Sequence, residues 1–318
     1  MILSVRDLAV SFRTEAGLVR VLDGINFDVA EGEVLGIVGE SGSGKTVTML
    51  AVMGLITDPN ARISGSIRFR GRELVGLSNR EMRHLRGREM AMIFQDPMTA
   101  LTPVYTIGWQ IAEQVLAHQS LTRRAAWTRA IDLLAEVGIP KPQEAAHRYP
   151  HQLSGGMRQR AVIAMALSCN PALLVADEPT TALDVTVQAQ ILDLLRQLQA
   201  RHGSAIVFIT HDLGVMADLA DRIMVMYAGR IVERAGAEAL FAAPLHPYTG
   251  ALLASIPPLE GPRPHRLLAI EGAPPSLLAL PHGCAFAPRC RKVFAACSVT
   301  PALRGQAHAV ACHLEPAA

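Results

Sequence analysis

The chain has 318 residues, with 30 Lys and Arg against 28 Asp and Glu, and its formal net charge of +2 gives no electrostatic footprint for nucleic acid. Half of the residues are hydrophobic, yet no apolar run approaches the roughly 18–20 residues that span a bilayer, and the first residues lack the pattern of a signal peptide. We therefore expect a soluble, cytosolic protein that reaches a membrane only by docking on another subunit. Aromatic residues, at 4%, are too few for a platform that stacks nucleic-acid bases.

The N-terminal residues predict an antiparallel sheet. Apolar and polar residues alternate over residues 1–30, with a break at Ala16-Gly17 that fits a hairpin turn. Residues 63–69 are expected to add a strand to the same sheet. Phe12 lies in the first of these strands and, taken alone, is most simply a core residue.

A phosphate-binding loop follows an apolar strand at residues 34–38. The stretch GESGSGKT matches G-x-x-x-x-G-K-[ST], and a helix over residues 46–53 completes the strand–loop–helix context of that motif. The glycines let backbone N–H groups point at the β- and γ-phosphates of a nucleotide, Lys45 reaches those phosphates, and the Thr46 hydroxyl ligates Mg²⁺. The nucleotide-binding residues predicted in this loop are Gly39, Ser41, Gly42, Ser43, Gly44, Lys45 and Thr46.

Further short apolar runs predict a parallel α/β sheet, because they have strand character and alternate with helical stretches. They cover residues 90–94, 172–176, 205–209 and 223–227. Between Asp96 and Pro150 the pattern turns helical, with amphipathic helices expected over residues 107–118 and 124–137.

The stretch LSGGMRQR predicts a second anion site. Ser154, Gly155 and Gly156 precede a helix over residues 157–167, so they offer a hydroxyl and free backbone N–H groups at a helix N-terminus, where the dipole favours negative charge. A serine N-cap followed by two loop glycines is the simpler alternative. The phosphate-binding loop elsewhere in the chain favours the anion site.

Polar residues follow three of the apolar runs. Asp177 and Glu178 end the run at 172–176, where Asp177 fits a carboxylate that orients Mg²⁺ and Glu178 a general base that polarises water. Capping carboxylates before Pro179 are the alternative. Gln95 and His211 also follow strand-like runs, although a lone Gln is usually a surface residue and an isolated His is more often structural.

In this order, the phosphate-binding loop, LSGGMRQR and the Asp177-Glu178 pair resemble the ATP-binding cassette (ABC) family. The resemblance implies an α/β P-loop NTPase (ABC ATPase) core with an antiparallel β subdomain. It implies an ATP-binding domain over residues 1–240, in which a helical subdomain occupies about residues 96–165.

The same resemblance implies roles for the weaker motifs. Gln95 would ligate Mg²⁺ and sense the attacking water, His211 would touch the γ-phosphate, and Phe12 would stack on adenine. Ala182-Leu183-Asp184 would form the loop that passes between two subunits.

The resemblance further implies partners. Two ATPase subunits, identical or paralogous, would close head to tail, so that Lys45 and Asp177 of one face ATP–Mg²⁺ while Ser154 and Gly156 of the other cap the γ-phosphate. Two membrane permeases and an extracytoplasmic solute-binding protein would complete an importer, with this chain at the cytoplasmic face of the inner membrane. No nucleic acid is expected as a partner.

From about residue 241 the composition changes. Prolines crowd in and periodicity fades, which predicts an irregular extension over residues 241–318. His246-Pro247-Tyr248-Thr249 and the residues up to Pro257 resemble the C-terminal extension of oligopeptide and dipeptide importer ATPases. Uptake of di- or oligopeptides is the function implied, with nickel or glutathione as alternative solutes.

Four cysteines cluster in this extension, whereas Cys169 stands apart in a predicted helix as a small buried residue. The four are Cys284, Cys290, Cys297 and Cys312. Because cytosolic chains seldom keep disulfides, the cluster suggests a metal. Its spacing departs from zinc pairs, and thiolates in a loop-rich segment suit iron–sulfur.

The stretch CAFAPRC also resembles the cysteine motif of peptide-importer ATPases, some of which carry a [4Fe–4S] cluster. We predict such a cluster, with zinc and no metal as alternatives. His282, His308 and His313 leave a mixed ligand set open.

Two functions from other classes are a soluble ABC ATPase that acts on ribosomes or DNA and a purely regulatory nucleotide-binding module. Ribosome-acting members usually join two cassettes, and DNA-repair members carry a long coiled coil, neither of which this sequence has. Intact Glu178 and His211 argue against the regulatory module.

Overall fold

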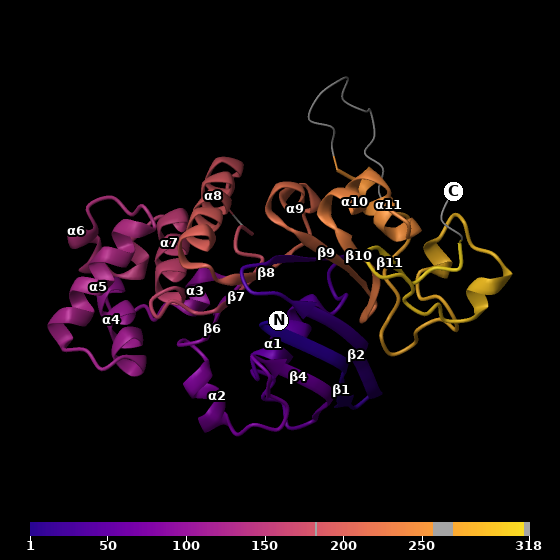
Figure 1. The fold of residues 1–318 in the computed structure, drawn as a ribbon, viewed down its shortest axis with the longest axis horizontal. Helices are drawn as coiled ribbons and strands as arrows, with labels where there is room; N and C mark the ends of the chain where they lie inside the picture. Colours follow the sequence, from indigo (N-terminus) through magenta and orange to yellow (C-terminus); the bar gives the residue numbers. More distant parts are fainter. Residues whose placement is uncertain (182, 257–269, 315–318) are drawn as a thin grey trace, which may run out of the picture.

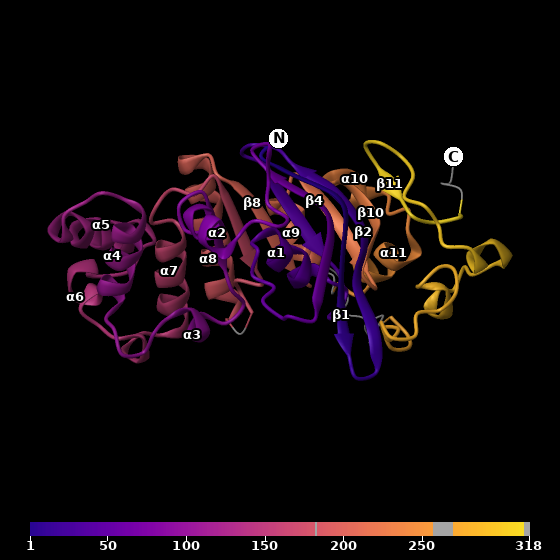
Figure 2. The same cartoon turned by 90° about the horizontal axis from the view of Figure 1, so that it is seen from below.

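The structure is a computed structural model that describes residues 1–181, 183–256 and 270–314. Two β-sheets occupy the middle of an elongated molecule, with a group of helices at one end and the C-terminal extension at the other (Figures 1 and 2). The antiparallel sheet lies against one side of the larger sheet, and most of the later helices cover the opposite side.

The smaller sheet is antiparallel, as the N-terminal alternation predicts. β1 (Leu3–Thr14) and β2 (Gly17–Val29) form a hairpin in which Thr14 pairs with Gly17, so the turn lies at the predicted break. β4 (Ala61–Phe69) pairs with the other edge of β1 and carries the short β5 (Arg72–Glu73).

The larger sheet has the strand order β11-β10-β9-β3-β8-β7-β6. Its parallel strands are β3 (Val34–Val38), β6 (Met90–Ile93), β7 (Leu173–Asp177), β8 (Ala205–Thr210) and β9 (Arg222–Tyr227). These are the five predicted strands. β10 (Arg230–Gly236) and β11 (Ala309–Val310) extend the sheet in antiparallel orientation.

The core lies on both faces of the larger sheet, because alternate residues of each strand point to opposite sides. On β8, Val207 and Ile209 pack toward the antiparallel sheet and α1 (Lys45–Val52), whereas Ile206 and Phe208 pack toward the helices. All four side chains are 1% exposed or less. This two-sided burial explains why the strands read as unbroken apolar runs.

The helical end of the molecule is the segment between β6 and β7. Its helices are α3 (Pro97–Ala100), α4 (Ile107–His118), α5 (Arg123–Glu136), α6 (Pro142–Ala146), the 3-10 turn η1 (Pro150–Gln152) and α7 (Gly155–Ala166). The observed α4 has the predicted bounds, and α5 begins and ends one residue earlier than predicted. The other core helices are α2 (Asn79–Leu85), α8 (Val185–His202) and α9 (Leu213–Leu219).

The C-terminal extension is more regular than its composition predicts. It contains α11 (Pro247–Ala254), the 3-10 turns η2 (Ala287–Arg289) and η3 (Ala295–Ser298), and β11, and it follows α10 (Ala237–Ala242). Pro247 does not disrupt α11 because it sits in the first turn, where its missing N–H is not needed. Pro257, Pro258, Pro262 and Pro264 lie outside the described residues.

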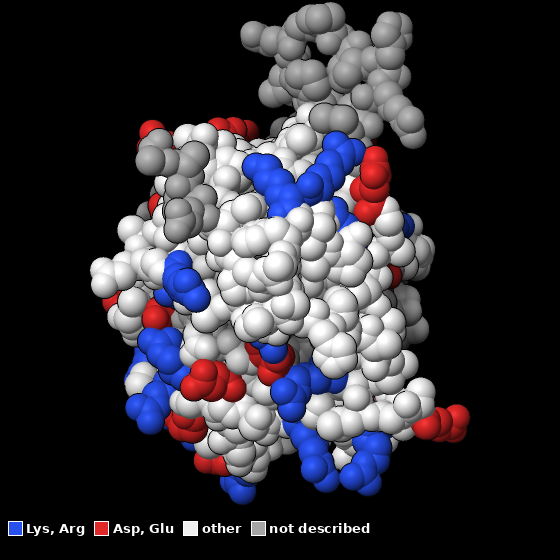
Figure 3. Space-filling view, turned by 90° about the vertical axis from the view of Figure 1, so that its right-hand side faces the viewer, with Lys and Arg blue, Asp and Glu red and all other residues white. Residues whose placement is uncertain are grey.

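The extension forms an end face with few charges at its centre (Figure 3). Among the described residues, no helix has both the length and the apolar character needed to cross a bilayer.

Candidate functional site

The loop between β3 and α1 requires glycine at two positions. Gly39 has φ +153°, and a Cβ there would lie 2.2 Å from the carbonyl oxygen of Met226. Gly44 has φ +101°, and a Cβ there would lie 2.6 Å from the Leu22 side chain. The loop therefore lies directly on β9 and β2, and its backbone opens toward a cavity at the N-terminus of α1.

That cavity is the candidate nucleotide-binding site. From the loop and α1 it is lined by Glu40, Ser41, Gly42, Gly44, Lys45 and Thr46. Gln95, Glu178 and His211 line it from the ends of β6, β7 and β8, so the predicted residues meet at the carboxyl edge of the parallel strands. Ser43 is 3% exposed and lies beneath this surface.

Lys45 is held by the loop itself. Its Nζ donates to the carbonyl oxygens of Gly39 and Glu40, at 2.8 and 3.0 Å. Burial lowers the pKa of Lys45, and the nearby carboxylates, Glu178 first, oppose that effect. The ammonium is thus positioned at the cavity, where an anionic ligand would favour its charged form.

Thr46 and Asp177 form the part of the site suited to a hard cation. The Thr46 hydroxyl donates to Asp177 Oδ1 over 3.2 Å, and Asp177 is 4% exposed. Burial raises the pKa of Asp177, and the hydrogen bond from Thr46 opposes that effect. A hydroxyl and a carboxylate in contact fit Mg²⁺, which takes oxygen ligands and completes its shell with water and substrate phosphates.

Glu178 is the most constrained residue of the site. Its φ of +46° is rare for a residue other than glycine, and strained backbone of this kind is concentrated at functional sites. Gln95 Nε2 donates to Glu178 Oε2 over 3.0 Å, and the Thr181 hydroxyl donates to the same oxygen over 2.9 Å. His211 Nδ1 lies 3.3 Å from Glu178 Oε1. The carboxylate is therefore aimed into the cavity by three neighbours.

The residues of LSGGMRQR lie elsewhere. Ser154 caps α7, its hydroxyl accepting from the Met157 N–H over 3.3 Å. A Cβ at Gly156 would lie 2.8 Å from Val187 at the start of α8, which accounts for this glycine. Within the described part of the chain, neither Ser154 nor its two glycines line the cavity.

Two further predicted residues, Phe12 and Asp184, do not line the cavity. Phe12 on β1 pairs with Val19 and packs on the core beneath the antiparallel sheet, whereas Val21 lines the cavity. Asp184 caps α8 by accepting from the Val187 N–H. Ala182, in the predicted loop between subunits, lies outside the described residues.

Sequence patterns missed several residues at this site. Thr181 orients Glu178, and its only signal is its place after the Asp177-Glu178 pair. Pro274 and Leu277 line the cavity from the C-terminal extension, and Arg289 pairs with Glu40 of the loop. No local pattern marks these three, because they reach the loop only through the tertiary fold.

The four clustered cysteines meet at one small cavity in the C-terminal extension. Cys284, Cys290, Cys297 and Cys312 all line it, with His313. Burial raises the pKa of Cys284 and of Cys290, and the neighbouring Cys297 adds to both effects. Among the described residues, no three or more His, Cys, Asp or Glu side chains are arranged to hold a single metal ion.

The prediction for Cys169 is wrong, and two of the histidines near the clustered cysteines in sequence lie away from their cavity. Cys169 is not a buried residue within a helix: it is half-buried in the turn after α7, which ends at Ala166. His308 is engaged away from the cysteines, with Nε2 lying 2.6 Å from Glu233 Oε1. His282 does not line the cysteine cavity.

Comparison with known proteins gives consistent matches. Residues 22–181 match the model of the ABC transporter family, and residues 232–297 match the model of the oligopeptide/dipeptide transporter C-terminal region. The chain is 54% identical to the oligopeptide transport ATP-binding protein OppD of Bacillus subtilis, over 91% of this chain and 81% of that protein. It is 51% identical to the dipeptide transport ATP-binding protein DppD of Escherichia coli, over 91% of this chain and 88% of that protein.

The fold also matches a solved structure, the dimeric bacterial ABC transporter cassette MJ0796. The TM-score is 0.66 at 26% identity, and the match covers 74% of this chain and 98% of the cassette.

Proposed function

The chain belongs to the ABC transporter family, as an ATP-binding subunit of the oligopeptide/dipeptide type, and we propose that it hydrolyses ATP to drive peptide uptake. The observation that carries the proposal is the convergence of Lys45, the Thr46–Asp177 pair and Glu178 on one cavity. Lys45 and Thr46 are positioned by the start of α1, and Asp177 and Glu178 by the end of β7. Together they supply what phosphoryl transfer to water requires.

Different residues of the cavity bind the phosphates, bind Mg²⁺ and activate the attacking water. The loop N–H groups and Lys45 bind the phosphates of the substrate, and Mg²⁺, bound through Thr46 and Asp177 with Gln95 beside them, would neutralise their charge. Glu178 accepts the proton of the attacking water, because its carboxylate lies at the cavity with its geometry fixed by Gln95 and Thr181. His211, close to Glu178, orients the γ-phosphate.

The division into domains is part of the proposal. Residues 1–240 form the ATP-binding domain, with the helical subdomain at about 96–165, and residues 241–318 form the extension. The secondary structure supports these bounds. The helical subdomain contains α3 to α7, and the extension begins at the end of α10. Among its described residues, the extension contributes only the two-residue β11 to the larger sheet.

The separation of Ser154 from the nucleotide cavity supports a dimer. Its anion-binding helix start has no phosphate to bind within its own chain, so Ser154, Gly155 and Gly156 serve the site of a second ATPase subunit, identical or paralogous. The family likeness to a dimeric cassette agrees with this arrangement. Phe12, on β1, is assigned to adenine.

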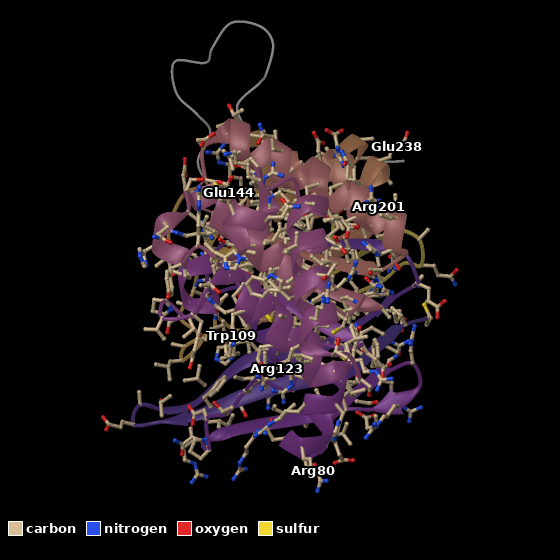
Figure 4. All side chains as sticks on the ribbon, turned by 90° about the vertical axis from the view of Figure 1, so that its left-hand side faces the viewer. Arg80, Trp109, Arg123, Glu144, Arg201 and Glu238 are labelled. Carbon is tan, nitrogen blue, oxygen red and sulfur yellow. The ribbon has the colours of Figure 1, made fainter. Side chains whose placement is uncertain are left out.

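An apolar groove next to the helical subdomain supports a permease partner. It is lined mostly by side chains from the end of α1, β6 and α7, including Met53, Met92 and Met165. Exposed aromatic residues lie on the same subdomain: Trp109, labelled in Figure 4, stacks on Tyr105 with ring centroids 4.0 Å apart. An amphipathic helix of a membrane subunit would fit such a groove. The chain would then work at the cytoplasmic face of the inner membrane, with two permeases and a solute-binding protein.

Reconstitution tests the proposed function. In liposomes that hold the chain with its permeases and solute-binding protein, we expect ATP-dependent accumulation of a labelled di- or oligopeptide, and none with an ATP analogue that cannot be hydrolysed. Accumulation of nickel or glutathione in place of peptides would contradict the assigned substrate while leaving the ATPase role intact.

For the cysteine cavity we propose a [4Fe–4S] cluster held by Cys284, Cys290, Cys297 and Cys312. The convergence of four thiols on one small cavity supports it. Such a group would cross-link a segment with little regular structure and would stabilise the thiolate forms that burial disfavours.

Iron analysis tests this cluster. Anaerobically purified protein is expected to be brown and to contain about four iron atoms per chain, and Cys290→Ser to lose most of them, because one ligand is removed. Cys169→Ser is the matched control and keeps its iron. Colourless wild-type protein without iron contradicts the cluster, and one zinc per chain replaces it with the zinc alternative.

A further inference from the structure

Arg289 of the C-terminal extension holds the phosphate-binding loop. Its Nη1 donates to Glu40 Oε2 over 2.6 Å and its Nη2 to Glu40 Oε1 over 2.9 Å, which makes a two-pronged ion pair. The Arg289 side chain is 5% exposed and that of Glu40 25%. The pair joins residues 249 positions apart in the sequence and is protected from solvent on the arginine side.

The same guanidinium ties down the wall of the nucleotide cavity. Nε donates to the Glu271 carbonyl over 2.9 Å and Nη2 to the Ile270 carbonyl over 3.4 Å. These residues begin the segment from which Pro274 and Leu277 line the cavity. The Arg289 guanidinium also lies over the rings of Tyr227 and Phe286, and these contacts help to fix its position.

A second contact fixes the backbone of Glu40. Its N–H donates to the hydroxyl of Tyr248 on α11 over 2.8 Å, and Tyr248 is fully buried. The first residue after Gly39 is therefore held at its backbone by α11 and at its side chain by η2. The loop conformation that cradles phosphate depends on two contacts from the extension.

The charge of Glu40 makes the ion pair matter for nucleotide binding. Glu40 lines the cavity, and its carboxylate would repel the phosphates if it were free. A bidentate guanidinium neutralises the Glu40 carboxylate and keeps it from rotating toward the ligand. Removing one partner of such a protected pair leaves the other charge uncompensated, which costs more than the loss of an exposed pair.

We propose that Arg289 is a positioning residue of the nucleotide site, through which the C-terminal extension sets the affinity for ATP. Arg289 acts through Glu40 and through the segment at residues 270–277, without touching the substrate. The inference rests on the proposed binding of MgATP at the phosphate-binding loop. It makes docking of the extension a condition for tight nucleotide binding.

MgATP binding to the full-length chain, measured by calorimetry, tests the proposal. Arg289→Ala is expected to raise the dissociation constant about tenfold, and Arg289→Lys to fall between it and the wild type, since lysine keeps the charge without the fork. Glu40→Gln added to Arg289→Ala is expected to recover part of the affinity, because the uncompensated carboxylate is gone. In the assembled complex, KM for ATP rises while kcat stays within about twofold.

Arg291→Ala is the matched control, because Arg291 pairs with Glu271 in the same segment but is 75% exposed. It is expected to bind MgATP like the wild type. Wild-type affinity in Arg289→Ala overturns the proposal, as does a fall in kcat with unchanged KM. Should Arg289→Ala lose its cooperative thermal transition, Arg289→Lys decides by the same criteria. Failure of the wild type to bind MgATP would contradict the proposed function itself.

Discussion

Replacing Glu178 with glutamine is expected to lower the rate of ATP hydrolysis by about 10²- to 10⁴-fold while leaving MgATP binding intact. Glutamine has nearly the shape of glutamate and can still accept the hydrogen bonds of Gln95 and Thr181 through its carbonyl oxygen. It cannot accept a proton from water. The bound nucleotide then persists, and the closed dimer that it stabilises accumulates.

Two measurements distinguish the loss of ATP hydrolysis from the accumulation of the closed dimer. Phosphate release from the assembled complex reports turnover, and size-exclusion chromatography in MgATP reports the trapped dimer. Glu238→Gln is the matched control, an exposed carboxylate on α10 (labelled in Figure 4), and is expected to hydrolyse ATP normally. Near-normal turnover by Glu178→Gln would refute the assignment of the general base.

The parts of the site that could be predicted are those in which local sequence determines local geometry. Gly39 and Gly44 are required because the loop lies against β9 and β2. The spacing of glycines in the motif therefore predicts this close packing. Asp177, Glu178 and His211 follow buried runs, and the carboxyl ends of parallel strands meet at one edge. These residues could be brought together from the sequence without a structure.

The parts that could not be predicted depend on distant contacts. Arg289 belongs to a proline-rich segment with no helical or strand period, and nothing near Glu40 marks it as the end of an ion pair. β11 has two residues and exists because the edge of β10 offers free backbone groups. Cys169 is predicted to lie in a helix, but α7 ends three residues earlier.

Dimers that combine two variants of this chain test the head-to-tail arrangement. A large change in the rate of ATP hydrolysis is expected. Lys45→Ala removes the ammonium that faces the phosphates. Ser154→Asp keeps a good helix cap for α7 but places a carboxylate against the γ-phosphate of the opposing subunit. If two copies of this chain form the dimer, each variant alone breaks both sites and hydrolysis is lost.

Mixing the two variants is expected to restore about a quarter of wild-type hydrolysis. Random pairing puts about half of the dimers in the mixed form, and each of these has one site built from an intact loop and an intact opposing helix start. Ser154→Asn is the matched control, because it keeps the cap without the charge and is expected to retain most activity.

A paralogous partner changes the expected pattern in a defined way. Beside a wild-type paralogue, Lys45→Ala and Ser154→Asp each break a different site, so each single variant keeps the other site and only the double variant loses both. The head-to-tail arrangement is contradicted if mixing restores nothing and each single variant abolishes hydrolysis beside a wild-type partner. Since Ser154 lies outside the nucleotide cavity of its own chain, only a site shared between two subunits can bring it to the nucleotide.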